Sequence, residues 1–394
     1  IRKNLNNNKD VVILTSTYYP VHTTSAQLPH QTAKHLVSQG LGVTVLCQKT
    51  DGVDTTEGIE GVEVERVGHA SAFNFLWGML LKLRTIRQHK VLMVYNTSKI
   101  IMFIALLSKL LYNIPVVTVV YTVQPDLDGA LGRCKRNGLY YKLTKYLTGG
   151  IYKYSGCIIA ISGDMKNYLI KHRHVNPSSI TVIENWAIEE HYGLSGADSK
   201  LTKTTKQDNY LTVSYLGTMG DAQDLDTLLQ AMSDSRLKNQ PYIQFVFAGS
   251  GTQVSKVKGV IRDQSIRNAT IHGYLTGEDF TKVLDDSDVY LLTLKESLTG
   301  LEVPSKFYTY LYQTKVIVGI ISSETDISKS ITQHHLGKVV DNGDVEGLVV
   351  ALLDLVKTLP LVDKQVYSNY YSREIQCNKY LQVIKTLIKK GERQ

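Results

Sequence analysis

Two series of short apolar runs alternate with amphipathic stretches, and this alternation constrains the fold more than any other feature of the chain. In the first half, apolar runs at 11–16, 91–96 and 115–121 are separated by segments of helical period. In the second half, runs such as 210–217 and 288–294 follow the same pattern. Strands that are apolar throughout are buried on both faces, and parallel strands need crossover helices. The pattern therefore predicts two parallel sheets, each covered by helices on both sides.

A polar segment divides the two series. Between about residues 187 and 209 the alternation stops, and Ser, Thr and Lys dominate without a period, as in interdomain linkers. A chain of 394 residues is also too long for one ordinary core. We predict two doubly wound, Rossmann-like α/β domains facing across a cleft that holds the ligands. The predicted parts are an N-terminal domain over 1–190, a linker over 191–209, a C-terminal domain over 210–364, and a helical segment over 365–394 that packs back towards the N-terminal domain.

Excess positive charge is confined to the first half. Residues 1–200 hold 22 Lys and Arg against 14 Asp and Glu, whereas the remaining residues hold 22 of each. Such an excess indicates a polyanionic partner, an anionic membrane surface, or only solvated lysines. No nucleic-acid recognition module is recognisable, so no nucleic-acid partner is predicted. Two basic amphipathic stretches, 71–90 and 98–112, fit peripheral contact with lipid as well as simple cover for a sheet.

Cysteine usage and hydropathy set the expected location. The four cysteines lie far apart, without the spacing of metal ligands, which predicts a reduced protein. The first ten residues are polar, and no signal-peptide pattern follows them. The longest apolar run, 100–107, is too short to span a bilayer. We expect a cytoplasmic protein, either soluble or at the inner face of the cell membrane.

Two glycine-containing turns follow strands of the second half. Gly217, Thr218 and Gly220 lie between a predicted strand and a helix, where small residues let backbone N–H groups approach a diphosphate. An ordinary strand-to-helix turn is the alternative interpretation. Gly249 and Ser250 also follow a strand, but without the third glycine of a dinucleotide fingerprint.

The segment Pro304–Ser305–Lys306 carries the strongest functional signal. Pro304 suits the first turn of a helix, so Ser305 and Lys306 would present backbone donors and an ammonium to a diphosphate. The alternative is an exposed lysine on a capped helix. Glu302, just before the segment, could accept hydrogen bonds from sugar hydroxyls, or it is a surface acid.

Aspartate pairs and histidines give weaker signals. Three D-x-D pairs begin at Asp126, Asp224 and Asp286, and three matches in one chain indicate background frequency. Only Asp126 is kept as a candidate for substrate contact, and no metal site is predicted. His22 lies in the loop after the first strand, from which it could face the cleft.

Five segments, in the right order, resemble the GT4 family of retaining glycosyltransferases with the GT-B fold. The resemblance covers nearly the whole chain and is closest to the capsule and O-antigen branch that includes N-acetylfucosamine transferases. The segments are YYPVHTTSA (18–26), GLGVTVL (40–46), SGCIIAISGDMKNYLI with SITVIENW (155–186), YLGTMGDAQDLDTLLQAM (215–232) and VPSKFYTYLYQTKVIVG (303–319).

The resemblance implies a reaction and a set of site residues. It implies transfer of a hexosyl or N-acetylhexosaminyl group from a nucleotide-sugar, a UDP-sugar, to a glycan or polyprenyl-diphosphate-linked acceptor, with retention and without metal or other cofactor. The N-terminal domain would take the acceptor and the C-terminal domain the nucleotide-sugar. The implied residues are catalytic Lys306, Glu302 and Asp126, donor-binding Gly217, Thr218, Gly220, Gly249, Ser250, Pro304, Ser305 and Thr309, and acceptor-side His22, Ser25 and Gln124.

The chain departs from the family pattern at several of these positions. Thr309 stands where the second acid of an E-x7-E pair grips the ribose, and the first acid aligns with Leu301. Thr218 and Gln223 stand where many members carry Arg and Lys, and the loop 121–126 lacks the histidine of some relatives. These departures motivate a second hypothesis, a non-catalytic partner of an active transferase. A sugar-nucleotide epimerase is the third.

Overall fold

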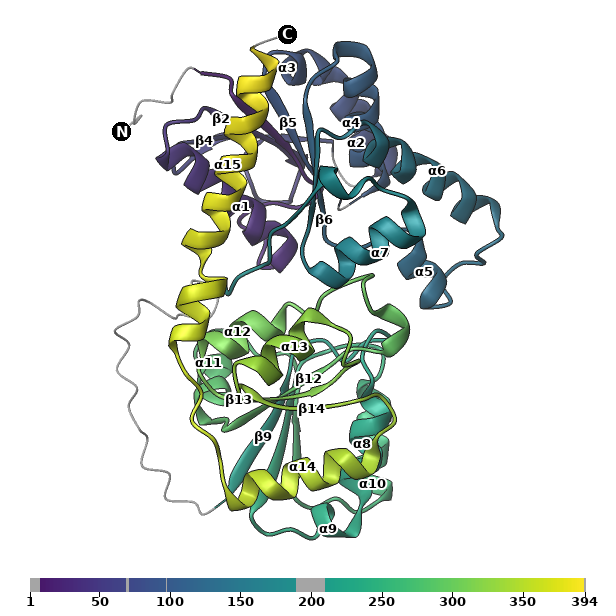
Figure 1. Ribbon diagram of the computed structural model, residues 1–394, viewed down its shortest axis with the longest axis vertical. Helices are drawn as coiled ribbons and strands as arrows, with labels where there is room; N and C mark the ends of the chain where they lie inside the picture. The colour runs from purple at the N-terminus through teal and green to yellow at the C-terminus, as the bar shows by residue number, and fades with distance from the viewer. Residues whose placement is uncertain (1–7, 69–70, 97, 189–209, 393–394) are drawn as a thin grey trace. The chain divides into compact units, whose positions relative to one another are not determined.

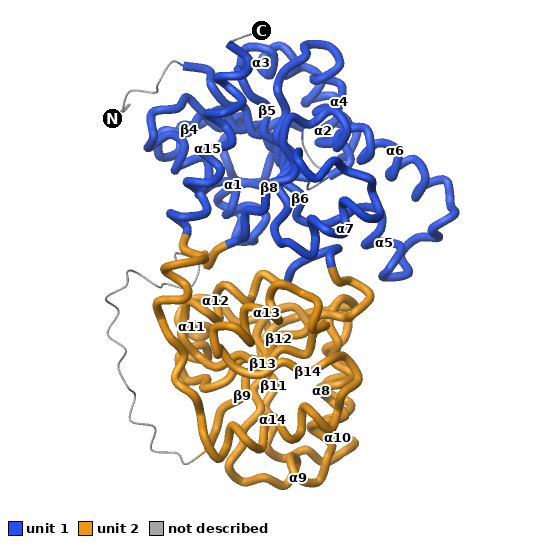
Figure 2. The backbone as a smooth tube through the Cα atoms, viewed as in Figure 1, with its two compact units in different colours: residues 1–185, 300–303, 373–394 blue, residues 186–299, 304–372 orange. Residues whose placement is uncertain are grey.

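The structure is a computed structural model that describes residues 8–68, 71–96, 98–188 and 210–392 (Figure 1). The chain divides into two compact units, coloured blue and orange in Figure 2. Unit 1 comprises residues 1–185, 300–303 and 373–394, and unit 2 comprises residues 186–299 and 304–372. The predicted linker, 191–209, lies outside the described residues. The chain thus returns to unit 1 twice, and the first return, at 300–303, was not predicted.

Unit 1 is built on an eight-stranded sheet with the strand order β3-β4-β2-β1-β5-β6-β7-β8. All neighbouring strands are parallel except β3 and β4, which form an antiparallel pair. Strand β3 was not predicted, because its four residues, TEGI, are short, polar and at least partly exposed. The strands are β1 Val11–Leu14, β2 Val43–Gln48, β3 Thr56–Ile59, β4 Val62–Val67, β5 Val91–Tyr95, β6 Val116–Val120, β7 Cys157–Ala160 and β8 Ile180–Val182.

Helices cover this sheet, and the last helix of the chain is one of them. Helix α15 contacts α1 and β5, and its Asn378 Oδ1 lies 3.0 Å from His35 Nε2 of α1. Residues 365–372, by contrast, lie in unit 2. The helices are α1 Thr24–Ser38, α2 Ala72–Leu81, α3 Leu83–Arg87, α4 Lys99–Tyr112, α5 Asp126–Ala130, α6 Leu139–Tyr154, α7 Gly163–Arg173 and α15 Arg373–Gly391, with a 3₁₀ turn at Pro177–Ser179.

Unit 2 is built on a six-stranded parallel sheet with the order β11-β10-β9-β12-β13-β14. At the centre of this sheet, Val213, Phe245 and Leu291 are completely buried in one core cluster. The chain leaves β9 in one direction and returns to its other side at β12, so the strand order reverses there. The strands are β9 Leu211–Leu216, β10 Ile243–Ala248, β11 Ala269–His272, β12 Val289–Thr293, β13 Val316–Ile320 and β14 Gly337–Val340.

The helices of unit 2 connect these strands in succession. They are α8 Leu225–Ser233, α9 Ser235–Lys238, α10 Val254–Asp263, α11 Gly277–Asp286, α12 Lys306–Tyr312, α13 Asp326–Gln333 and α14 Val345–Lys357, with a 3₁₀ turn at Glu296–Leu298 and a π turn at Tyr367–Tyr371. The predicted fold class, two doubly wound α/β domains, is confirmed. In such sheets the carboxyl edge at the reversal point is the usual ligand site. None of the described helices combines the length and apolar character that a membrane span requires.

Candidate functional site

The loops after β9 and β10 lie in direct backbone contact. The Gly217 N–H donates to the Ala248 carbonyl (2.7 Å), and the Met219 N–H donates to the Ser250 carbonyl (2.8 Å). A Cβ on Gly249 would lie 1.9 Å from the Gly217 oxygen, and its φ of +148° is itself a glycine conformation. The glycines therefore allow two loops to pack at a distance that no side chain would permit.

Lys306, the first residue of α12, reaches back to the loop after β9. Its Nζ lies 2.9 Å from Tyr215 Oη and 3.3 Å from the Thr218 carbonyl oxygen. The same ammonium lies 4.0 Å from the centroid of the Tyr215 ring, a cation–π geometry. A Cβ on Gly217 would lie 2.9 Å from Lys306 Cε, so this glycine makes room for the lysine.

Tyr215 is a site residue that the sequence analysis missed. Its hydroxyl donates to the Thr218 carbonyl at 2.7 Å while accepting from Lys306. Burial raises the pKa of Tyr215, so the phenol stays protonated and neutral. In the sequence it is one more aromatic residue in a buried strand, and no local signal distinguishes it.

The charge of Lys306 is not balanced by an acid. Within the described residues, Lys306 takes part in no ion pair; its Nζ donates to a phenol and to a carbonyl oxygen. Burial lowers the pKa of Lys306 to about 7, since desolvation penalises the charged form. An ammonium that is shielded from water and not paired with a carboxylate carries a desolvation cost. A bound anion would offset that cost.

Helix α12 is held at the sheet by its aromatic residues. Tyr310 Oη lies 3.1 Å from the Leu216 oxygen and 3.3 Å from the Leu216 N–H, and its ring stacks on Tyr290 at 4.3 Å. Thr309 is buried in this helix, one turn after Lys306. The Phe307 N–H donates to the Pro304 carbonyl at 3.1 Å. These contacts fix the start of α12 beside the loop after β9, where the strand order reverses.

Gln223 closes the turn that the resemblance assigns to the diphosphate. Its Oε1 accepts the Gly220 N–H at 2.9 Å, and Gln253 donates to the Gly220 carbonyl. The position where many relatives carry a lysine therefore serves here to shape the loop, and one of the loop's amides is already used. Ser250 and Thr218 lie exposed at the surface of the two loops.

Asp126 is engaged in contacts within unit 1. Its carboxylate lies 2.8 Å from Arg173 Nη1 and accepts the Tyr141 hydroxyl at 2.8 Å. The Arg173 guanidinium also donates to the Gln124 carbonyl at 2.8 Å. The side chains of Arg173 and Asp126 are 2% and 9% exposed. Both carboxylate oxygens of Asp126 thus have partners, which gives this residue a clear structural role.

Glu302 belongs to unit 1, although Lys306 belongs to unit 2. Its segment is tied there by the Val123 N–H, which donates to the Leu301 carbonyl (2.9 Å), and by the Gly300 N–H, which donates to Asp164 (3.1 Å). Burial raises the pKa of Glu302, while Arg133 acts in the opposite direction. The two residues are four apart in the sequence, and the unit boundary lies between them.

The predicted acceptor-side residues lie in the segments that directly follow β1 and β6. Ser25 Oγ lies 3.4 Å from Thr17 Oγ1 and 3.2 Å from Thr23 Oγ1, at the start of α1, and His22 is exposed just before it. Gln124 Nε2 donates to Asp128 at 3.4 Å. In the described part of the chain its Oε1 is buried without a partner. Both segments lie at the carboxyl edge of the same sheet.

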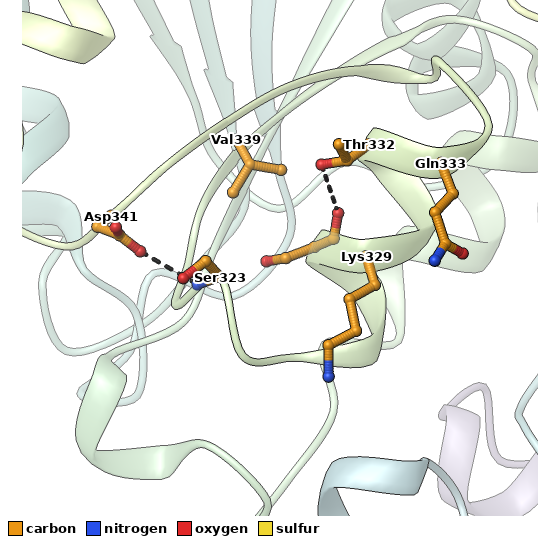
Figure 3. Close-up of a pocket in the computed structure, with 7 residues that line it drawn as sticks. Ser323, Lys329, Thr332, Gln333, Val339 and Asp341 are labelled. Atoms are coloured by element: carbon orange, nitrogen blue, oxygen red, sulfur yellow. Dashed lines mark hydrogen bonds between the residues drawn. The ribbon is translucent and has the colours of Figure 1, made fainter.

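A separate polar hollow of about 410 Å³ lies between α13 and β14 in unit 2 (Figure 3). The Ser323 N–H donates to Asp341 Oδ1 at 3.1 Å across its rim, and the Thr332 hydroxyl donates to the Ser328 carbonyl at 3.0 Å. No predicted site residue lines this hollow. Its two charged lining residues are Lys329, whose Nζ lies 4.0 Å from Asp326 Oδ1, and Asp341, whose carboxylate accepts the Ser323 N–H.

Doubly wound units on mainly parallel sheets, with a lysine and glycine-containing turns at a strand-order reversal, are typical of proteins that bind phosphorylated ligands such as nucleotides. Two family models match the chain: Glycosyltransferase Family 4 over residues 27–188 and Glycosyl transferases group 1 over residues 211–358. The chain is a glycosyltransferase with the GT-B fold.

Individual relatives agree with this assignment. The chain is 26% identical to the probable glycosyltransferase WbjE of Pseudomonas aeruginosa, over 81% of this chain and 80% of that protein. Its fold is similar to that of Anabaena Alr3699/HepE, solved in complex with UDP (TM-score 0.71, 10% identity, 96% of this chain and 100% of that one). It is also similar to WaaG, a glycosyltransferase involved in lipopolysaccharide biosynthesis (TM-score 0.68, 13% identity, 95% and 99%).

Proposed function

We propose that this glycosyltransferase uses a nucleoside-diphosphate sugar, a UDP-sugar, and that Lys306 binds its diphosphate. The observation that carries the proposal is the Lys306 ammonium above Tyr215, at the reversal point of the sheet, which forms no ion pair with any described residue. The Anabaena relative of the same fold binds UDP, which supports this donor class. Gly217 and Gly249 keep the neighbouring loops free of side chains that would obstruct a phosphate.

The proposed reaction is transfer with retention of configuration. The bond between the anomeric carbon and the diphosphate oxygen breaks, and a bond to the acceptor oxygen forms on the same face of the sugar. The acceptor proton passes to the departing diphosphate, and the Lys306 cation stabilises the charge that develops there. No protein nucleophile and no metal ion take part. Retention is tested by nuclear magnetic resonance of the product, and metal independence by activity in the presence of a chelator.

The proposed acceptor is a glycan or a polyprenyl-diphosphate-linked sugar, in the synthesis of a surface polysaccharide. One relative, 22% identical over 46% of this chain, is a putative colanic acid biosynthesis glycosyl transferase of Escherichia coli, which supports this class of pathway. Transfer of a hexosyl or N-acetylhexosaminyl group, and the likeness to N-acetylfucosamine transferases, stay predictions. Glu302, His22, Ser25 and Gln124 stay candidates for sugar and acceptor contact.

A second candidate function is that of a non-catalytic partner of another transferase. Gln223 favours it, because its side chain occupies the Gly220 amide of the loop assigned to the diphosphate. Thr309 favours it too, because a threonine hydroxyl cannot replace the two acceptor oxygens of a carboxylate. The third hypothesis, a sugar-nucleotide epimerase, would be revealed by epimerisation of a sugar nucleotide without an added acceptor.

The deciding experiment combines binding and turnover. Purified protein is titrated with UDP, GDP and their sugar derivatives by calorimetry, and the same donors are then offered with lipid-linked acceptors and analysed by mass spectrometry. We expect UDP binding that Lys306→Ala removes while the fold is kept. The matched control is Lys338→Ala, an exposed lysine of β14 in the same unit. Binding without turnover would favour the partner role, and absence of binding to any nucleotide would refute the proposal.

A further inference from the structure

Exposed apolar side chains gather on three helices of unit 1. Among the described residues, eleven of the nineteen exposed large apolar side chains belong to α2, α4 and α6. Exposed apolar surface of this extent normally marks a binding surface. The exposed apolar surface, as we call it, consists of Phe73, Trp77, Leu81, Phe103, Leu110, Leu111, Leu139, Tyr140, Leu143, Tyr146 and Tyr154.

Helix α2 has two apolar faces, and the fold uses only one of them. Phe75 and Met79 are buried against the rest of unit 1. Phe73, Trp77 and Leu81 recur every fourth residue on another stripe, with exposed fractions of 74%, 58% and 67%. Residues spaced by four lie on one side of a helix. The outer stripe contributes nothing to the core, so its apolar character needs another explanation.

The three helices form one continuous layer. Helix α4 contacts both α2 and α6, and Figure 1 shows the three next to one another in unit 1. The contact between α4 and α6 is close, since a Cβ on Gly150 would lie 3.1 Å from Leu106. On α6, Leu139, Leu143 and Tyr146 repeat the spacing of an exposed stripe.

The segment that carries this surface also carries the positive charge of the protein. Residues 71–156 contain twelve Lys and Arg against two Asp, whereas the whole chain has a net charge of +8. The two acids are engaged inside unit 1, Asp126 with Arg173 and Asp128 with the Tyr140 hydroxyl. Lys142, Lys145 and Lys153 are exposed along α6. The surface therefore joins apolar, aromatic and cationic groups, the composition that anionic lipid surfaces attract.

We propose that the layer of α2, α4 and α6 binds the surface of an anionic membrane, with the outer stripes inserted at the headgroup level. A second copy of the chain is a poorer occupant, because a two-fold interface would place these like charges against one another. The inference goes beyond the proposed glycosyl transfer and does not depend on it. Its test measures lipid binding alone.

The test is co-sedimentation of the full chain with vesicles. One vesicle type is pure phosphatidylcholine, and in the other about a third of the lipid is phosphatidylglycerol. We expect binding to the anionic vesicles, and its loss when salt is raised from about 0.1 M to about 1 M. Reversing three charges, in Lys142→Glu/Lys145→Glu/Lys153→Glu, should lower the partition coefficient on the order of a hundredfold. The apolar variant Phe73→Ser/Trp77→Ser/Leu81→Ser should also abolish sedimentation.

Matched variants in unit 2 separate the proposed surface from general effects of charge and polarity. Lys258→Glu/Lys338→Glu/Lys364→Glu changes the net charge equally at three exposed lysines. Tyr242→Ser/Tyr274→Ser/Leu361→Ser removes three exposed apolar side chains. Both controls should bind anionic vesicles as the unchanged chain does. Equal losses in the controls, equal binding to neutral vesicles, or no binding by the unchanged chain would each overturn the proposal.

Trp77 gives a local signal of insertion. The chain has two tryptophans, and Trp186 is 2% exposed, so a blue shift of emission on anionic vesicles would report on Trp77. The shift should disappear in Trp77→Phe, which keeps the surface apolar and should still sediment. If the unchanged chain is instead a dimer whose dissociation follows the apolar α2 variant, the layer is a subunit interface and the lipid assignment is wrong.

Discussion

Replacing Lys306 by methionine should make the free protein more stable and at the same time remove its affinity for nucleotide. Methionine keeps a chain of similar length but carries no charge. In the free protein, as far as the described residues go, the Lys306 ammonium contacts the Tyr215 hydroxyl and ring and the Thr218 carbonyl and takes part in no ion pair. Removing a charge that no acid compensates relieves a desolvation cost. The same charge is needed when a diphosphate binds.

The magnitude follows from the pKa of Lys306. Burial lowers this pKa to about 7, against about 10.4 in an unfolded chain. Below pH 7 both states hold the proton and the full cost is present. Between pH 7 and about 10.4 the folded state releases the proton first, so the stability of the unchanged protein rises with pH. The full shift corresponds to at most about 5 kcal/mol. Because the side chain is partly exposed and loses two hydrogen bonds, we expect a net gain of about 1–2 kcal/mol at pH 6.5.

The assay is thermal unfolding of the unchanged protein and Lys306→Met across pH 6.5 to about 9.5, with and without UDP. Without UDP the variant should melt about 2–6 °C higher at pH 6.5, and the gap should close as pH rises. With UDP the order should invert, because only the unchanged protein gains binding energy. A variant that is less stable at pH 6.5, or a gap independent of pH, would refute the reasoning about an uncompensated charge.

Three further outcomes are expected. UDP affinity should fall by up to about tenfold per pH unit above pH 7, because Lys306 loses its proton. Calorimetry in two buffers should then show proton uptake on binding. An affinity that is constant to about pH 9 would contradict this. Gly249→Ala should destabilise unit 2 by more than about 3 kcal/mol, since its Cβ would lie 1.9 Å from a carbonyl oxygen. The control Gly259→Ala, which has open space in α10, should be neutral or stabilising. Denaturant unfolding measures both. Asp126→Asn should lower the free energy of unfolding by about 3 kcal/mol, because it leaves the buried Arg173 side chain without its carboxylate. UDP affinity should stay within about twofold. A large loss of activity at unchanged stability would instead indicate a catalytic role.

Local periodicity made the fold predictable from the sequence. The central parallel strands, such as β5, β6 and β12, are buried along their whole length, so their residues form apolar runs in the sequence. The antiparallel strand β3 was missed because it is polar and partly exposed. The glycine turns were also predictable, because a backbone conformation that only glycine adopts readily depends on a single residue. Gly249, for example, has a φ of +148°.

The partners of each candidate side chain were decided by the tertiary structure alone. Asp126 and Arg173 are 47 residues apart, and their ion pair has no signature in the local sequence. Conversely, Glu302 and Lys306 are near neighbours in the chain, yet they belong to different units.

The sequence by itself determined that the chain forms two doubly wound units with glycine-containing turns, because backbone conformation and burial period are properties of neighbouring residues. Only the tertiary structure decided that Lys306 lies over Tyr215, with no acid among the described residues paired to it, and that α2, α4 and α6 form one layer. The physical reason is that desolvation and charge compensation depend on atoms brought together from distant parts of the chain.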